Sequence, residues 1–456
     1  MERDAIDFET LKVSKLFRKL FFPTLMGMLS ISAVTAIDGI FVGHGVGSDG
    51  IAAVNICVPL LMLFTGLGLM IGSGCSVVTS IHLSKKKYKI ARLNVTQALL
   101  FVTIVTVTFT AFIMIFPEQT AFLLGSSEQL LPMVKDYLLW FIPSLTFQMW
   151  ISVSLFIIRL DGAPKLAMYC SLISAVVNVV LDWLFIFPLG WGVMGAAFAT
   201  SISIVTGGLI AIIYLLFFAN SLRPHPIKIS RKSLLLSLRN IYYQCRIGSS
   251  SFLGEATLAM LMFMGNLVFM HYLGDDGVGA FGIACYYLPF VFMIGNSIAQ
   301  SAQPIISYNF GAKKPHRVAS TIKISLYTAI ICGVIVTVVF LFFPKFLVSL
   351  FLDTNNSAAL IAINGFPYFA IGFIFFIMNL CIIGYYQSME KIKPATGFAL
   401  LRGFIFLIPC FLLTPKLLNE PGIWLALPIS EILTMVFIII YFLYFRIRDK
   451  KTASLE

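Results

Sequence analysis

The chain contains long stretches without a single charged residue. The longest cover residues 93–117, 137–158, 183–222, 277–312 and 354–389. A helix that crosses a bilayer needs about 20 predominantly apolar residues, and each stretch supplies at least that many. Transmembrane β-strands alternate apolar and polar residues over about ten positions, which these continuous runs do not. The sequence therefore predicts an all-α polytopic membrane protein.

The overall composition agrees with this prediction. Hydrophobic residues make up 59% and charged residues 11% of the 456 positions, whereas a soluble domain carries about 25% charged residues. The net charge of +12 would indicate nucleic-acid binding only if the basic residues formed one patch, and they are spread over many loops. We expect the lipid bilayer as a partner, no nucleic acid, and no metal cofactor, because no CxxC or His/Cys cluster is present.

Charges, prolines and glycines divide the chain into about twelve predicted spans. The turn at 188–192 splits the uncharged stretch 183–222 into two of them. The predicted spans lie near 17–43, 51–80, 94–116, 137–158, 166–187, 195–218, 247–272, 279–306, 324–343, 364–386, 395–413 and 423–444.

The distribution of Lys and Arg predicts the orientation. Of the 32 Lys and Arg residues, 28 fall in the two termini or in loops on the same side as the termini. The opposite side carries only Lys135, Lys345 and Lys416. Basic loops remain in the cytosol, so we expect a multi-pass protein of the cell membrane with both termini cytosolic.

The two halves of the sequence resemble each other. Residues 47–56 (GSDGIAAVNI) match 274–283 (GDDGVGAFGI) at an offset of 227. We predict an N-lobe over 1–218 and a C-lobe over 247–456, joined by a cytosolic linker over 219–246. Two six-helix bundles are typical of transporters with a substrate path between the lobes. Residues 230–246 are amphipathic and are predicted to form a helix along the inner leaflet.

Ionisable side chains at membrane depth are costly, so each is a candidate functional residue. Asp38 and Asp182 are predicted to lie at similar depth in the first and fifth spans. Asn178 precedes Asp182 by one helical turn, and Thr200 in the sixth span is predicted to lie at a comparable depth in the membrane. These groups could bind Na⁺ or share a proton, since two close carboxylates disfavour a second negative charge. The alternative is a hydrogen-bonded cluster without a transport role.

Three further ionisable residues lie in the second half of the sequence. Glu255 in the seventh span could meet substrate or a coupling cation, or it could be neutralised by Arg402 or kept protonated. Arg402 in the eleventh span needs a carboxylate or helix-end carbonyl groups as partners. Glu431 in the last span is similar in kind.

Several segments resemble the multidrug and toxic compound extrusion (MATE) transporters. They are FPTLMGML at 22–29, IDGIFVG at 37–43, RLDGAPK at 159–165, NVVLDWLFI at 178–186 and GAAFAT at 195–200. The resemblance implies a V-shaped, pseudo-twofold pair of bundles that exports organic cations in exchange for H⁺ or Na⁺. It also implies a cation site in the N-lobe, formed by Asp38, Asn178, Asp182 and Thr200.

The same resemblance assigns Glu255 to the seventh-span glutamate of the Na⁺-coupled branch. That branch pairs its glutamate with an aspartate in the tenth span, and residues 354–389 contain no acid. The resemblance therefore favours coupling through the N-lobe.

We expect a monomeric, cation-coupled antiporter for small organic cations, with H⁺ or Na⁺ as coupling ion, no cofactor and no catalytic residues. Glu255 and Arg402 are its candidate substrate-binding or coupling residues. The alternative function is a flippase for a lipid-linked precursor, which would need a basic cleft for pyrophosphate. A membrane enzyme is not supported, because no nucleophile and base pairing, metal motif or phosphate loop is present.

Overall fold

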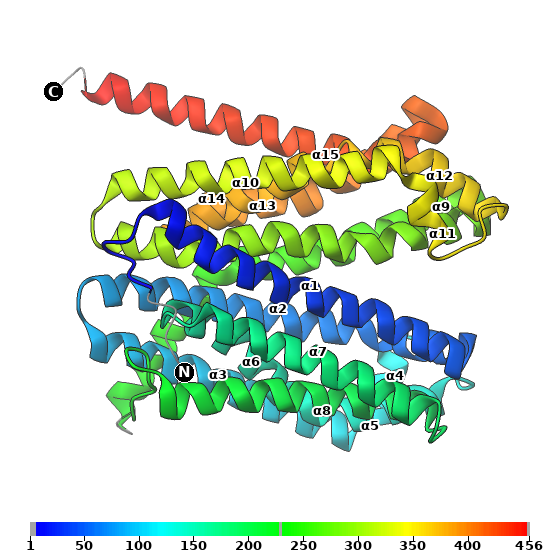
Figure 1. The fold of residues 1–456 in the computed structure, drawn as a ribbon, viewed down its shortest axis with the longest axis horizontal. Helices are drawn as coiled ribbons and strands as arrows, with labels where there is room; N and C mark the ends of the chain where they lie inside the picture. Colours follow the sequence, from blue (N-terminus) through cyan, green and yellow to red (C-terminus); the bar gives the residue numbers. More distant parts are fainter. Residues whose placement is uncertain (1–5, 228–229, 454–456) are drawn as a thin grey trace. The chain divides into compact units, whose positions relative to one another are not determined.

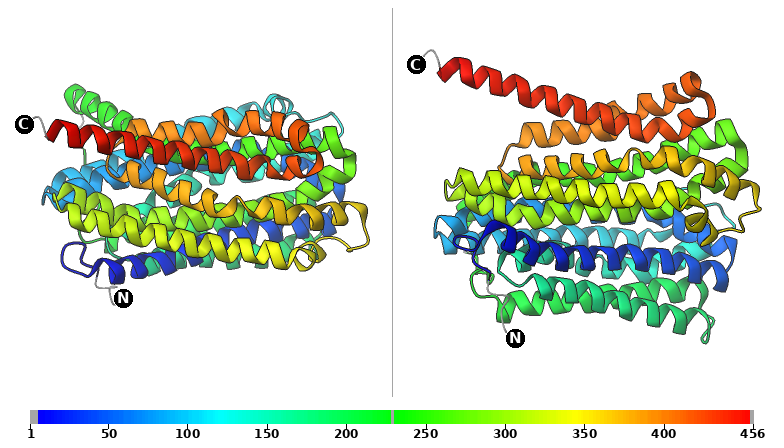
Figure 2. Two further views of the ribbon diagram at one scale, coloured as in Figure 1. Left: turned by 90° about the horizontal axis from the view of Figure 1, so that it is seen from above. Right: turned by 45° about the horizontal axis from the view of Figure 1, so that its top comes forward.

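The computed structural model describes residues 6–227 and 230–453. Arg3, counted above among the cytosolic charges, and residues 228–229 of the predicted linker lie outside the described residues. The described chain consists of helices and connecting loops and contains no β-strand (Figure 1, Figure 2). The predicted all-α class is confirmed.

The helices before the linker are α1 Val13–Gly45, α2 Ser48–Ser84, α3 Tyr88–Ile115, α4 Pro117–Leu123, α5 Leu131–Phe141, the 3₁₀ turn η1 Ile142–Ser144, α6 Leu145–Leu160, α7 Pro164–Ile186, α8 Gly192–Ile213 and the π-helical η2 Tyr214–Phe218. Proline opens α4 and α7, where the first turn lacks an acceptor for its N–H.

The later helices are α9 Arg231–Gly311, α10 Pro315–Phe342, α11 Pro344–Ser349, α12 Ser357–Ala370, α13 Phe373–Ser388, α14 Ile392–Leu400, the π-helical η3 Leu401–Ile405 and α15 Leu407–Ala453. The helix predicted for residues 230–246 forms the start of α9 and continues directly into the seventh span.

Twelve segments of the described chain can be counted as membrane spans. Nine helices are long and apolar enough to cross a membrane, and the pair α12 and α13, bent by 49°, adds one more. Two of the nine stretches count twice. Arg231–Gly311 is interrupted at Gly274, and Ile392–Tyr444, which includes α14, η3 and most of α15, is interrupted at Asn419; both residues have non-helical φ and ψ. The number of predicted spans is therefore confirmed.

The sequence repeat recurs in the backbone. Left-handed φ angles appear at an offset of 227 residues in the pairs Gly47 and Gly274, Lys86 and Lys313, and Gly192 and Asn419. Glycine and asparagine tolerate this region of φ better than other residues. Corresponding turns of the two halves thus share a residue with positive φ.

The chain packs into two compact units. Unit 1 contains the described residues up to Glu255 together with Ser297–Ile324 and Gly384–Ile392. Unit 2 contains Ala256–Asn296, Ser325–Ile383 and the described residues from Lys393. The boundaries of these units are defined by packing and do not coincide with those of the sequence repeat. The predicted lobe boundaries therefore stay a prediction.

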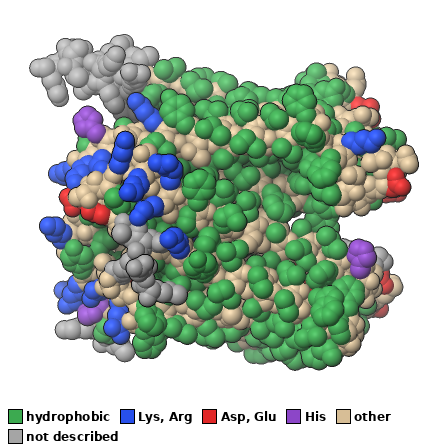
Figure 3. Space-filling view, in the orientation of Figure 1, with side chains coloured by type: hydrophobic (Ala, Val, Ile, Leu, Met, Phe, Trp, Pro, Cys, Tyr) green, Lys and Arg blue, Asp and Glu red, His purple; other side chains and the backbone are tan. Residues whose placement is uncertain are grey.

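Unit 1 therefore includes one end of several helices from the second half of the chain. The loop 85–87 between α2 and α3 and the loop 312–314 between α9 and α10 lie together there, because Gly311 packs against Ile81 and Ser84. We call the end of unit 1 that carries these two loops the basic end. Lys and Arg side chains gather at one end of the visible surface, and hydrophobic side chains cover its middle (Figure 3).

Two glycines allow α2 and α9 to touch through their backbones near the basic end. A Cβ atom on Gly248 of α9 would lie 1.7 Å from the carbonyl oxygen of Met70 in α2. A Cβ atom on Gly74 of α2 would lie 1.9 Å from the carbonyl oxygen of Gln244 in α9. Small residues permit this close approach of membrane helices.

We predict that Gly248→Ala destabilises the folded protein by about 1–3 kcal/mol, because the added methyl group forces the two backbones apart. The midpoint of thermal unfolding of the purified protein in detergent measures this loss. Gly282→Ala on the same helix is the matched control, since no atom lies within 4 Å of its added Cβ. Equal unfolding midpoints for the two variants would contradict the close packing.

Candidate functional site

The four residues of the predicted cation site come together in unit 1. Asp38 lies on α1, Asn178 and Asp182 lie one turn apart on α7, and Thr200 lies on α8. Helix α7 packs against both α1 and α8, which brings the three helices to one place. The predicted proximity of these residues agrees with the structure, whereas their function remains a prediction.

The residues of this site are largely buried and form few hydrogen bonds. Asp182 is 0% and Asn178 1% exposed, and Asp38 is half-buried. The carboxyl groups of Asp38 and Asp182 lie within electrostatic range of each other. The Asn178 Nδ2 donates to Thr200 Oγ1 at 3.4 Å, and Thr200 Oγ1 donates to the carbonyl oxygen of Ala196 at 2.9 Å.

Four buried oxygen atoms of this site have no hydrogen-bond partner within the described chain. They are Oδ1 of Asp38, both carboxylate oxygens of Asp182, and Oδ1 of Asn178. None of the ion pairs found in the described chain involves either carboxylate. An unpaired buried charge is expensive, so this site needs a proton or a bound cation.

The structure adds Tyr137 of α5 to the surroundings of the site. Its side chain is 5% exposed and lies within electrostatic range of both Asp38 and Asp182. The sequence did not reveal it, because a tyrosine at the start of an apolar run is ordinary and α5 is distant in the chain. Its stacking on Phe141, with ring centroids 5.6 Å apart, holds the ring in place.

Glu255 of α9 lies in unit 1. The residue is 7% exposed, and its Oε1 atom has no hydrogen-bond partner in the described chain. Gly66 of α2 lies beside it, since a Cβ atom on that glycine would be 3.5 Å from the Cβ atom of Glu255. This second buried carboxylate therefore also lacks a hydrogen-bond partner for one of its oxygens.

Arg402 and Glu431 form an ion pair inside unit 2. Arg402 Nε donates to Glu431 Oε1 at 2.7 Å, and both residues are 1% exposed. Asn379 Nδ2 donates to Glu431 Oε2 at 2.7 Å, and the guanidinium lies 4.0 Å from the ring centroid of Phe376. The carboxylate partner expected for Arg402 is thus Glu431, and neutralisation of Glu255 by Arg402 is not observed.

A second polar cluster, which the sequence analysis missed, joins helices of the two sequence halves near the basic end. Gln387 of α13 donates to the hydroxyl groups of Ser73 on α2 and Ser251 on α9, at 3.0 and 2.9 Å. These two hydroxyl groups lie 3.0 Å apart, and Gln303 Nε2 donates to the Ser73 carbonyl oxygen at 2.8 Å. A search for amides in apolar runs would have found the two glutamines.

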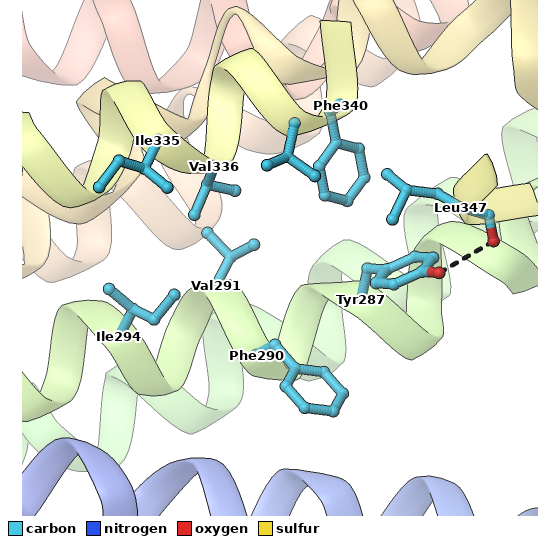
Figure 4. Close-up of a pocket in the computed structure, with 9 residues that line it drawn as sticks. Tyr287, Phe290, Val291, Ile294, Ile335, Val336, Phe340 and Leu347 are labelled. Carbon is cyan, nitrogen blue, oxygen red and sulfur yellow. Dashed lines mark hydrogen bonds between the residues drawn. The ribbon is translucent and has the colours of Figure 1, made fainter. Parts of the chain in front are cut away.

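One pocket of unit 2 lies between α9, α10 and α11 (Figure 4). Its lining is hydrophobic and includes Val291, Ile335 and Phe340. The only polar side-chain atom, the Tyr287 hydroxyl, donates to the Leu347 carbonyl oxygen at 2.9 Å. The pocket therefore suits alkyl groups and offers no site for a cation.

Comparison with known proteins identifies relatives along the entire chain. The sequence profile of the MatE family matches residues 23–184 and again 251–412, once in each half. The chain is 26% identical to the multidrug export protein MepA of Staphylococcus saprophyticus, over 98% of both chains. It is 28% identical to the protein of the same name from Staphylococcus aureus, over 98% of this chain and 97% of that one.

Solved structures share the fold. A transporter of the MOP superfamily from Pyrococcus furiosus superimposes with a TM-score of 0.87 at 19% identity over 98% of both chains. A multidrug resistance MATE family transporter, described in an outward-facing conformation, gives 0.87 at 20% identity over the same share of both chains.

The ion pair of unit 2 has a measurable consequence for stability. We predict that Glu431→Gln costs about 3–5 kcal/mol in the free energy of unfolding, because it leaves the buried guanidinium without a counter-charge. Thermal unfolding in detergent measures the loss. Glu118→Gln is the matched control, since the Lys135–Glu118 pair is exposed and such pairs contribute at most about 1 kcal/mol. Similar losses in both variants would contradict the interpretation.

Proposed function

The chain belongs to the MatE family, and on this premise we propose that it is a cation-coupled antiporter that exports amphipathic organic cations, including drugs, by alternating access. It is a multi-pass membrane transporter and not an enzyme. The names of the staphylococcal relatives, multidrug export proteins, support the drug substrates. The carboxylate pair Asp38 and Asp182 carries the proposal of cation coupling.

The coupling mechanism follows from the unpaired acids. A monovalent cation bound between Asp38 and Asp182 cancels one of their two negative charges. A cationic substrate that uses the same carboxylates or favours the other conformation expels that cation. Such antagonism is an unfavourable, positive coupling free energy between two ligands, and it acts equally in both directions. Asn178 contributes an amide oxygen, and Thr200 orients that amide. Neither needs to change its charge during the cycle.

We propose H⁺ as the coupling ion, with Na⁺ as a competitor at the same site. A proton needs only one carboxylate oxygen, and the second carboxylate then accepts a hydrogen bond from it. Sodium would use the four unpartnered oxygens and further oxygens from water or the backbone. The same side chains thus accommodate either ion.

The acids also favour cationic over anionic substrates. Glu255 offers a further buried carboxylate with one unpartnered oxygen, which would attract a positively charged guest. The alternative function, a flippase for a lipid-linked pyrophosphate, needs a basic side chain that is free to bind the pyrophosphate. Arg402 is neutralised by Glu431 and does not serve that purpose, so we retain the antiporter.

Alternating access requires a gate at each side of the membrane. We propose that the basic end faces the cytosol of a monomer in the cell membrane, with both termini on that side. The cluster of Gln387, Ser73 and Ser251 then acts as the cytosolic gate. Neutral hydrogen bonds contribute only about 0.5–1.5 kcal/mol each, so they can hold the gate shut and still break once per cycle.

We expect Asp38→Asn and Asp182→Asn each to reduce efflux in proteoliposomes to the level of protein-free vesicles. The amide keeps the volume of the side chain but no longer binds an exchangeable cation. Asp49→Asn, at an exposed position of α2, is the control and should transport normally. Full transport by either site variant would refute the assignment.

The identity of the coupling ion is tested by separating the two gradients. In Na⁺-free vesicles an imposed pH gradient should drive efflux of a fluorescent organic cation, and a protonophore should stop it, because a proton alone can occupy the site. Efflux that is absent under the pH gradient and starts on addition of a Na⁺ gradient would make Na⁺ the coupling ion.

A further inference from the structure

The first turns of α9, residues 231–246, have an inverted distribution of polarity. Most of the side chains that point into the protein are polar: Ser237 is 7% and Gln244 0% exposed, and Asn240 is half-buried. Ile241 is the buried apolar residue among them. In a water-soluble amphipathic helix the polar residues would lie outside. The environment of the outer face is therefore not water alone.

Hydrogen bonds to α3 fix this orientation. Asn240 Nδ2 donates to Asn94 Oδ1 and to Gln97 Oε1. Gln97 Nε2 in turn donates to Ser237 Oγ at 2.9 Å, and Gln244 Nε2 donates to Asn94 Oδ1 at 3.4 Å. Rotation of the segment about its axis would leave these amides unpaired, so the outward face is determined.

The outward face carries large apolar side chains. We call Leu234, Leu235, Leu238 and Tyr242 the leucine face; they are 62%, 61%, 52% and 64% exposed. Positions 234, 238 and 242 follow one another at single helical turns, so they form one continuous stripe. The segment lies immediately before the seventh span and beside the start of the third, where a membrane surface meets the protein.

Basic residues flank the stripe. We call Arg231, Lys232, Arg239 and Arg246 the basic rim; each is exposed. Residues 231–246 contain no Asp or Glu, and none of the ion pairs found in the described chain involves the rim. The Arg246 guanidinium lies 5.8 Å from the ring centroid of Tyr242, which joins the rim to the leucine face.

We propose that this surface is a binding site for anionic phospholipid, with acyl chains on the leucine face and phosphate groups at the basic rim. Apolar stripes bordered by Lys and Arg are suited to the boundary between headgroups and acyl chains. Each basic side chain near an anionic lipid surface strengthens binding roughly fivefold. This inference does not depend on the substrate or the coupling ion.

The test compares two triple variants that remove the same charge. One is R231Q/K232Q/R239Q in the basic rim, and the other is K85Q/K86Q/K87Q in the exposed loop between α2 and α3. Binding of fluorescent phosphatidylglycerol to the full-length protein in detergent is titrated for both, with phosphatidylcholine as the neutral lipid. We expect the rim variant to lose about a hundredfold in affinity for phosphatidylglycerol, because three basic side chains at roughly fivefold each are removed, and the loop variant to retain its affinity.

A variant of the leucine face, L234S/L238S, separates a lipid site from a site for free anions. We expect it to weaken binding of both lipids, while the thermal unfolding midpoint in detergent stays close to that of the parent because both positions are exposed. Equal losses in the rim and loop variants would mean a general charge effect and would overturn the proposal. Full phosphatidylglycerol binding by L234S/L238S would also overturn it, in favour of an anion site without a lipid.

Discussion

A carboxylate inside a membrane-spanning helix must be neutralised, and this chain does so in two different ways. In unit 2 the neutralising charge is part of the protein, because Arg402 binds Glu431 at 2.7 Å and Asn379 occupies the remaining carboxylate oxygen. In unit 1 Asp38 and Asp182 lie within electrostatic range of each other, and none of the ion pairs found in the described chain involves either of them. A basic side chain of the protein stays bound to its carboxylate. Carboxylates without such a side chain can instead bind a cation that exchanges with the solution.

This difference organises the proposed mechanism. An arginine tethered to its helix does not leave, so the pair in unit 2 contributes to stability and not to ion exchange. A proton or Na⁺ at Asp38 and Asp182 can leave, and its departure changes the charge of the place where α1, α7 and α8 meet. The gate that we propose near the basic end is held by hydroxyl and amide groups instead of charges, which would keep the free-energy cost of opening it small.

The sequence predicted much of this arrangement, for physical reasons. Uncharged runs identify spans because the bilayer excludes charge, and the turn-by-turn spacing of Asn178 and Asp182 places them on one helix face. The repeat could be read because Gly47 and Gly274 both require a left-handed backbone. The continuous helix from 231 into the seventh span needed the structure, since no local signal separates a surface helix from an extension of a span.

Residues that act through tertiary contacts were not predictable from one sequence. Tyr137 approaches the acids from a helix that is distant in the chain, and nothing in its local sequence indicates this. The sequence identified Glu431 as an acid within a span. Which of several basic residues pairs with it depends on how the helices pack. The tenth span contains no acid, yet Asn379 donates to Glu431 from that span, so an amide there participates in a buried charge cluster.

The most direct test of the account is whether substrate displaces the coupling cation from Asp38 and Asp182. The purified protein in weakly buffered detergent solution is mixed with an organic cation while a pH indicator and a sodium electrode record released ions. We expect proton release that saturates with substrate binding and is absent in Asp182→Asn. Saturable substrate binding without release of either ion, or unchanged release in Asp182→Asn, would contradict it.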